Sequence, residues 1–209
     1  MKYLPVIVVL VMACGQAPEV HVVKDRAGLV RAEVTRVHGM KDGPVRLYHD
    51  DGSLEAEGRY VKDKRQGTWT SFGPSGDTLA MGTYRDGLKD GPQAYWAPNG
   101  QLLRFERFQK GVSHGPLYRF YADGSPRQLT WYDDGVAEGR YIEWFKVDAT
   151  SVGLMFGQFH KGERTGRWTW FYANGKPNRQ GRYIAGRPVG VWRYWKPDGS
   201  LANTKDFGP

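Results

Sequence analysis

The sequence predicts an all-β protein, an elongated array of about seven 24-residue β-hairpin repeats that form one twisted antiparallel sheet. Three observations carry this prediction. A glycine recurs at a step of 24 residues, with a single step of 27. An aromatic residue stands five positions after each of these opening glycines, and a second aromatic ends each copy. An Asp-Gly, Asn-Gly or Ser-Gly pair separates the two aromatics in six of the seven copies. A fixed period of this size is typical of repeat architectures.

The repeat positions are fixed along the whole array. The opening glycines are Gly43, Gly67, Gly91, Gly115, Gly139, Gly166 and Gly190. The first aromatics are Tyr48, Phe72, Trp96, Phe120, Trp144, Phe171 and Trp195. The second aromatics are Tyr60, Tyr84, Phe108, Tyr132, Phe159, Tyr183 and Phe207.

Each copy is expected to form a β-hairpin. The first strand, as in Arg167 to Tyr172, is rich in β-branched and aromatic residues and is too short for a helix. The Asx-Gly pair turns the chain, because glycine tolerates positive φ. The second strand ends in Gly-x-aromatic, as in Gly82 and Tyr84, so both residues share a face and the glycine leaves room for a neighbouring ring. A lone hairpin is marginal in water, so the copies must stack.

The start of the chain is expected to lie outside the repeats. Residues 1–13 have a lysine at position 2 and an apolar run, Leu4 to Ala13, that is too short to span a bilayer. This pattern is typical of a secretory signal peptide. The segment from Val11 to Cys14 resembles a bacterial lipobox, which implies cleavage before Cys14, lipidation of Cys14 and retention at a membrane. The alternative is an ordinary signal peptide with an incidental cysteine.

Cys14 is the single cysteine, so no intramolecular disulfide is possible. Gly15, which follows it, resembles the residue choice of Gram-negative lipoproteins that are sorted to the outer membrane. The sequence therefore predicts a lipid-anchored protein of the cell envelope, on the outer membrane if the source is Gram-negative.

The remaining boundaries follow from periodicity. Residues 14–28 are polar and mixed, and are expected to be the lipidated cysteine and a tether. Residues 29–42 alternate, and are expected to be a degenerate half repeat that caps the array. Residues 43–209 hold the seven repeats. The fifth repeat has three extra residues near Asp148, which indicate a tolerated insertion more than a functional loop.

Composition and motifs argue against catalysis. The net charge is +8, but the charges are scattered through every repeat, which favours a solvated surface and gives no reason to expect a nucleic-acid partner. The histidines are not spaced as metal ligands, and the acidic pairs at Asp50 and Asp51 and at Asp133 and Asp134 adjoin turn glycines. No catalytic residue, metal site or cofactor is predicted.

The repeat pattern, with Gly-x-aromatic, Asx-Gly and Gly-x-Tyr in succession from Gly43 to Phe207, resembles the MORN repeat. It is most similar to the variant found in bacterial antidotes of toxin–antitoxin systems. The resemblance implies stacked hairpins in an elongated sheet and a role in interaction or scaffolding. It also implies binding of a toxin protein, although a signal peptide and Cys14 differ from a cytosolic antidote.

The predicted function is therefore that of a non-enzymatic envelope lipoprotein that binds a protein partner through its repeat sheet. The densest aromatic and basic group is offered as the contact site, with packing of the sheet as the alternative role for its rings: Trp69, Trp168, Trp170, Trp192 and Arg193. The alternative function is a glycan- or anionic-lipid-binding surface protein that uses Trp and Lys or Arg side chains.

Overall fold

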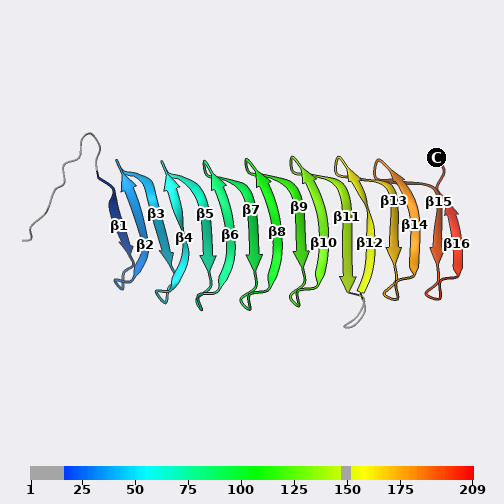
Figure 1. The fold of residues 1–209 in the computed structure, drawn as a ribbon, viewed down its shortest axis with the longest axis horizontal. Helices are drawn as coiled ribbons and strands as arrows, with labels where there is room; N and C mark the ends of the chain where they lie inside the picture. The colour runs from blue at the N-terminus through cyan, green and yellow to red at the C-terminus, as the bar shows by residue number, and fades with distance from the viewer. Residues whose placement is uncertain (1–16, 147–151) are drawn as a thin grey trace, which may run out of the picture.

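The structure, a computed structural model, describes residues 17–146 and 152–209 of the chain. Within these residues it contains sixteen strands and no helix (Figure 1). Each strand pairs antiparallel with the next one in the chain, so the strand order in the single sheet is the order in the sequence. β1 and β16 therefore lie at opposite ends of an elongated array. The predicted all-β hairpin array is confirmed.

The seven repeats supply β3 to β16, two strands each, and β1 and β2 precede them. The strands are β1 Glu19–Lys24, β2 Val30–Val37, β3 Met40–Tyr48, β4 Leu54–Val61, β5 Lys64–Phe72, β6 Thr78–Arg85, β7 Leu88–Trp96, β8 Leu102–Gln109, β9 Val112–Phe120, β10 Pro126–Asp133, β11 Val136–Lys146, β12 Val152–His160, β13 Glu163–Phe171, β14 Pro177–Ile184, β15 Arg187–Trp195 and β16 Leu201–Asp206.

The tether predicted for residues 14–28 is wrong over Glu19–Lys24, which form β1 and pair with β2. The segment has too few residues to display a repeat, but it carries three valines and lies next to a strand whose outer backbone groups would otherwise be unpaired. The half repeat predicted at residues 29–42 does form strand β2, and Val34 on it is buried against Val45 of the first repeat. The cap is thus a complete hairpin.

Successive repeats are joined by two-residue turns in which both central residues have positive φ. Asp86 and Gly87, with φ of 52° and 85°, are representative. This is the type I′ geometry, whose twist matches that of the flanking strands. One such turn holds Asp63 in place of glycine. The Asp63 side chain accepts a hydrogen bond from the Lys41 backbone N–H (2.8 Å), and its own N–H donates to the Lys41 carbonyl (2.8 Å), which holds the residue in this conformation.

Every opening glycine has positive φ, between 63° and 136°. It lies where one strand carries extra residues: the pairing of β6 with β7 passes from Tyr84 and Lys89 to Gly82 and Gln93. Two more residues therefore lie on β7 than on β6 between these pairs. Such bulges bend a strand and increase its twist. Each opening glycine thus marks a β-bulge, and the recurrence of these glycines means that the sheet bends at the same place in every repeat.

One face of the sheet, which we call the packed face, carries the residues two positions after each opening glycine together with the second aromatics. On this face, the packing of a ring against the preceding repeat depends on the residue two positions before each second aromatic, which must be small. A Cβ on Gly58 would lie 2.5 Å from Cε2 of Trp69 in the next repeat, and Gly157 and Gly181 are covered in the same way by Trp168 and Trp192. The predicted space for a neighbouring ring is confirmed.

The packed face holds two apolar clusters. The rings meet mostly edge to face, as between Tyr183 and Trp192, whose centroids are 5.1 Å apart at 85°. This geometry suits the opposite partial charges of a ring's face and edge. The clusters are centred on Val34, Val45 and Trp69 at one end and on Trp168, Trp170 and Trp192 at the other.

A polar segment separates these clusters in the third and fourth repeats. Gln93, Glu106 and Thr130 lie on the packed face, each no more than 3% exposed. Glu106 and Thr130 stand where other repeats have the glycine that accommodates a ring. The Glu106 carboxylate meets the Arg104 guanidinium at 2.6 Å, so the charge is paired within the sheet. Leu117, 3% exposed, lies between Glu106 and Thr130, so the two apolar clusters are joined by backbone pairing, polar contacts and one buried apolar side chain.

Candidate functional site: the open face of the sheet

The four tryptophans predicted as contact residues lie on the packed face and are buried. Trp168 is 0% exposed, and Trp69, Trp170 and Trp192 are 6%, 6% and 4% exposed. Arg193 is exposed on the other face, because neighbouring residues of a strand point in opposite directions. The structure therefore brings the tryptophans of the carboxy-terminal repeats together but separates Arg193 from them. Their burial favours the packing role over direct contact.

Other cations cover these rings. The guanidinium of Arg65 lies 4.3 Å from the ring centre of Trp69, and that of Arg164 lies 4.6 Å from Trp168. Both arginines stand two positions before an opening glycine, which is the sequence signal that could have identified them. Cation–π contacts of this kind stabilise rings at a partly exposed edge. The basic and aromatic residues of the repeat thus act together in packing.

The opposite face, which we call the open face, carries the residues one and three positions after each opening glycine and their cross-strand partners. One series of directly paired residues crosses all sixteen strands, and we call it the central row. From β1 to β16 it consists of Val22, Glu33, Arg46, Glu57, Thr70, Met81, Ala94, Phe105, Tyr118, Leu129, Ile142, Phe156, Thr169, Gln180, Arg193 and Thr204.

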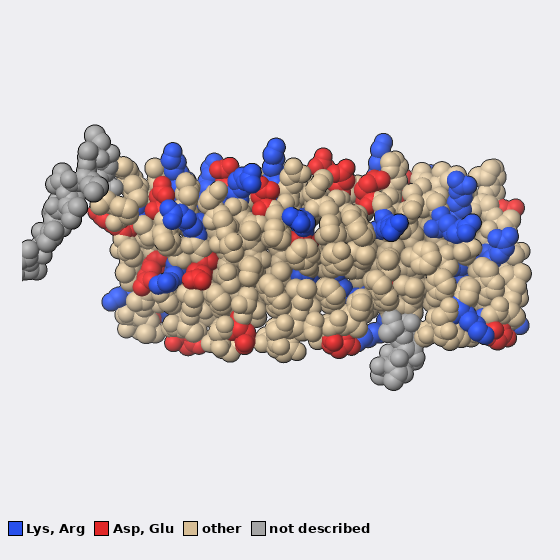
Figure 2. All heavy atoms as spheres, viewed as in Figure 1, with Lys and Arg blue, Asp and Glu red and all other residues tan. Residues whose placement is uncertain are grey.

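The chemistry of the central row changes along the array. It is charged over β2 to β4, apolar from Met81 to Phe156, and polar beyond. Met81 and Phe156, at the two ends of the apolar part, are 44% and 40% exposed, and Phe105 and Leu129 between them are half-buried. Figure 2 shows most charged side chains along the two long edges of the array and a broad, mostly uncharged band between them. Large contiguous apolar patches on protein surfaces are often interaction sites, so this band is the candidate contact surface.

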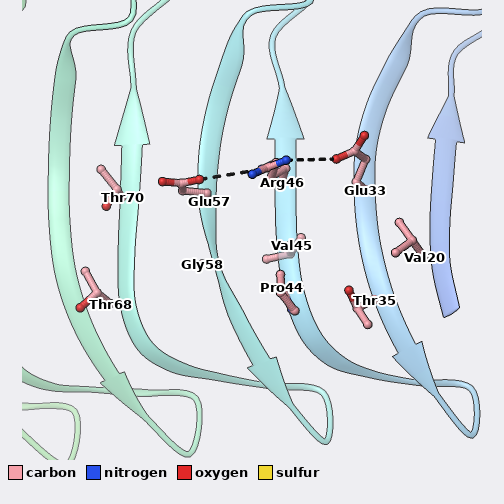
Figure 3. A pocket seen from close by; sticks show the side chains of 10 residues that line it. All are labelled: Val20, Glu33, Thr35, Pro44, Val45, Arg46, Glu57, Gly58, Thr68 and Thr70. Atoms are coloured by element: carbon pink, nitrogen blue, oxygen red, sulfur yellow. Dashed lines mark ion pairs between the residues drawn. The ribbon is translucent and has the colours of Figure 1, made fainter. Parts of the chain in front are cut away.

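At its amino-terminal end the open face is hollowed into a groove of about 630 Å³ (Figure 3). Arg46 lies between the carboxylates of Glu33 and Glu57, with a distance of 4.0 Å to each. Thr68 of the second repeat lies on the far wall. Tyr48 donates a hydrogen bond to Glu33 (3.0 Å), and burial together with this bond raises the pKa of the Tyr48 hydroxyl. This amino-terminal groove is polar and carries one more acidic than basic group.

A second hollow of about 420 Å³ occupies the equivalent place in the fifth repeat. Its apolar part is formed by Ile142 and Phe156, and its rim carries Arg140, Gln158 and Arg167. We call it the carboxy-terminal hollow. The repeat geometry thus provides the same kind of depression twice, and the residues at the variable positions give one an acidic and the other a basic and apolar character.

Three exposed side chains at a turn form the one group of possible metal ligands in the described part of the chain. His114, Asp133 and Asp134 have ligand atoms within 4.8 Å of one another, and His114 Nδ1 lies 3.2 Å from Asp133. The sequence analysis considered the histidines and the acidic pairs separately, whereas the pairing of β9 with β10 brings His114 alongside Asp133. Exposed turn carboxylates commonly lie together without an ion, so this cluster defines no metal centre.

Three sequence predictions fall on residues that the structure does not describe. The signal peptide of residues 1–13 and the lipidated Cys14 lie before residue 17, and Asp148 of the insertion lies between residues 146 and 152. In the described residues, no helix is long and apolar enough to cross a membrane.

Comparison with known families supports the repeat. The family model described as the MORN repeat variant matches residues 41–62 and 164–185. Each matched segment begins two residues before an opening glycine, at Lys41 and Arg164, and ends within the turn that leads to the next repeat. The matches therefore have the same phase as the hairpin unit of the sheet.

A search of curated proteins finds no match to the chain. MORN repeats are commonly protein- or membrane-binding modules, and their all-β fold is typically non-enzymatic. Of the seven repeats, the first and the sixth thus match the MORN repeat variant.

Proposed function

We propose that this chain is a non-enzymatic binding module that holds a protein partner on its open face. The observation that carries the proposal is the apolar part of the central row, which runs without interruption from Met81 on β6 to Phe156 on β12. Seven strands at a spacing of about 4.8 Å give this band a length of roughly 30 Å. A band of this length matches the apolar centre of an ordinary protein interface.

The burial of the four tryptophans predicted as contact residues argues against a glycan stacked on them. Sugar recognition by stacking needs exposed ring faces, and the rings of Trp69, Trp168, Trp170 and Trp192 are instead covered by neighbouring repeats. The open face offers mixed aliphatic and aromatic side chains, flanked by charged ends. Such a surface suits the core and rim of a protein interface.

Binding to anionic lipid is the second candidate, and the exposed arginines of the carboxy-terminal repeats favour it. Salt separates the two functions. Charge-driven adsorption weakens as ions screen the charges, whereas contact through an apolar band largely survives.

We also propose that lipid on Cys14 holds the module in the cell envelope, on the outer membrane if the source is Gram-negative. Neutralisation of a toxin protein is one form that such binding could take. Replacing Cys14 with serine is expected to move the protein from the membrane pellet to the supernatant in high salt. Continued sedimentation of that variant with membranes would contradict the anchoring proposal.

The binding function is tested with the full chain as bait for envelope extract at low and high salt. The expected result is one protein bound in stoichiometric amount at both salt concentrations. Met81→Glu and Phe156→Glu should each abolish this capture, because they place a charge in the apolar band. Leu88→Glu is the matched control, since Leu88 is also exposed (52%) but lies at the start of β7, outside the band.

Two outcomes would contradict the proposed function. One is capture of phospholipid or polysaccharide alone, lost at high salt. The other is equal loss of capture in Leu88→Glu and in the two open-face variants, which would mean that added negative charge and not the apolar band decides binding.

A further inference from the structure

The carboxy-terminal hollow lies within a group of arginines on the open face. Arg140 on β11, Arg167 on β13, Arg182 on β14 and Arg193 on β15 are all exposed. In the part of the chain that the structure describes, none of them lies within 4.0 Å of a carboxylate, although the arginine of the amino-terminal groove lies between two. The carboxy-terminal end of the open face is therefore basic, whereas at the amino-terminal end the exposed Arg59 and Arg46 balance Glu33 and Glu57.

The hollow itself combines charge with an apolar floor. Ile142 and Phe156 are cross-strand partners on β11 and β12, and Arg140 pairs across the strands with Gln158. The ring of Phe156 stacks on that of Phe171, with centroids 5.6 Å apart and an angle of 27° between the planes. This stacking fixes the floor of the hollow in one position, so a ligand group can be buried against it at a small cost in side-chain entropy.

We infer that the carboxy-terminal hollow binds an acidic segment of the protein partner, with an apolar side chain seated on Phe156 and carboxylates on Arg140 and Arg167. The inference rests on the proposed function and names the partner chemistry of the same face. Each guanidinium presents a fork of N–H donors that can hold one carboxylate, and Gln158 on the strand between them offers an amide for the backbone of the segment.

Strand geometry sets the spacing of the acidic residues. Arg140 and Arg167 stand two strands apart, which corresponds to about 10 Å between their backbones. An extended peptide advances about 3.3 Å per residue and its alternate residues point to the same side, so two acidic residues four positions apart, about 13 Å, face the sheet together within reach of the two long arginine side chains. The apolar residue lies between them. A peptide of this kind crosses the strands of the sheet alongside the central row, between Phe156 in the row and the two arginines beside it.

The test uses the full chain and a fluorescein-labelled peptide, Gly-Asp-Gly-Phe-Gly-Asp-Gly, in fluorescence anisotropy at moderate salt. Replacing phenylalanine in the peptide by alanine should weaken binding about tenfold, because the ring loses its contact with the floor. Arg140→Glu with Arg167→Glu should weaken binding of the original peptide by more than tenfold, because both carboxylate contacts become repulsive.

The matched control is Arg187→Glu with Lys196→Glu. Both residues are exposed, and the pair changes the net charge by the same amount outside the hollow. Binding in this control should change by less than threefold. An equal loss in the two double variants, or equal binding of the phenylalanine and alanine peptides, would overturn the inference. A second experiment uses vesicles of phosphatidylglycerol. If the wild type binds these vesicles but not the peptide, and Arg140→Glu with Arg167→Glu no longer binds the vesicles, then the arginines bind lipid headgroups. That result would also overturn the inference.

The two proposals fail separately. If the peptide does not bind while Met81→Glu still abolishes capture of the partner, the inference about the hollow is wrong and the binding function of the open face stands. If the peptide binds as expected but no protein is captured through the band, the hollow is a site and the proposed function is wrong.

Discussion

Replacing Gly157 with alanine tests whether each repeat is fitted to the next through a missing side chain. Gly157 on β12 is buried beneath the ring of Trp168, and a Cβ on it would lie 2.6 Å from Trp168 Cγ. Carbon atoms in contact lie about 3.5–4.0 Å apart, so the ring or the strand must move by about 1 Å. Trp168 is 0% exposed and is enclosed by Tyr141 and Phe159, at centroid distances of 5.6 and 5.3 Å.

The expected loss of stability has two parts. Overpacking of a closely packed site costs about 1–3 kcal/mol. Movement of the Trp168 ring also weakens the hydrogen bonds that its Nε1–H donates to the carbonyls of Gln158 and Thr165, both at 3.2 Å. Weakening this pair adds about 1 kcal/mol. The free energy of unfolding should therefore fall by about 2–4 kcal/mol.

Urea unfolding followed by far-ultraviolet circular dichroism measures this loss, and hydrogen exchange of the β12 and β13 amides shows where it acts. The second readout is needed because repeat arrays do not always unfold in a single step. Gly73→Ala is the control: Gly73 has no positive φ, and its added Cβ would lie 3.4 Å from Leu79. This control should lie within about 0.5 kcal/mol of the wild type.

A second variant tests the cause. In the fourth repeat Thr130 occupies the position that corresponds to Gly157. The residue of the next repeat that corresponds to Trp168 is there Tyr141, not a tryptophan. Adding Trp168→Leu to Gly157→Ala should therefore cost less than the sum of the two single changes, by about 1–3 kcal/mol. Equal stability of Gly157→Ala and the wild type, or strict additivity of the double variant, would refute the proposed fit between repeats.

Three further predictions concern polar contacts. Tyr172→Phe should lower the free energy of unfolding by about 1 kcal/mol, because the hydroxyl donates to the carbonyl of Trp195 in the next repeat (2.8 Å); no change in urea unfolding would contradict it. Burial and the hydrogen bond to Glu143 raise the pKa of Tyr141, so the unfolded chain loses this proton first as pH rises. The contribution of Tyr141 to the free energy of unfolding should be fully present below about pH 10 and should be lost as the pH rises above it. In Tyr141→Phe the free energy of unfolding should therefore fall less over this range. Glu106→Gln should cost about 1 kcal/mol, because the buried side chain at position 106 loses a charge-assisted hydrogen bond to Arg104, whose own side chain is 41% exposed to solvent. An unchanged urea midpoint would mean that solvent already satisfies Arg104.

The repeat itself was predictable because local geometry dictates it. The Asx-Gly pairs predict turns because glycine tolerates positive φ, and the alternation of side chains along the strands predicts which residues share a face. The glycine of the second strand predicts contact with a ring of the next repeat. Together these local features of one 24-residue period predicted the hairpins, their stacking and the cap strand β2. Strand β1 was missed, since Glu19–Lys24 contain no repeat signal and become ordered only by the free edge of β2. The structural role of the opening glycines could not be predicted from the sequence either, because a β-bulge is defined by the pairing register of two strands.

The sequence by itself determined the fold class, because each repeat encodes its own turns and its own contact with the next. It did not determine which surface is available for binding. From the sequence, Trp168 and Trp192 belong to the densest aromatic and basic group and are candidate contact residues. Only the stacked sheet shows that they are buried on the packed face, against the glycines of the preceding repeat. The central row joins residues about 11 to 14 positions apart on successive strands, from Met81 to Phe156, which become neighbours only through the register of pairing. Cross-strand register, a tertiary property, therefore decided the candidate site.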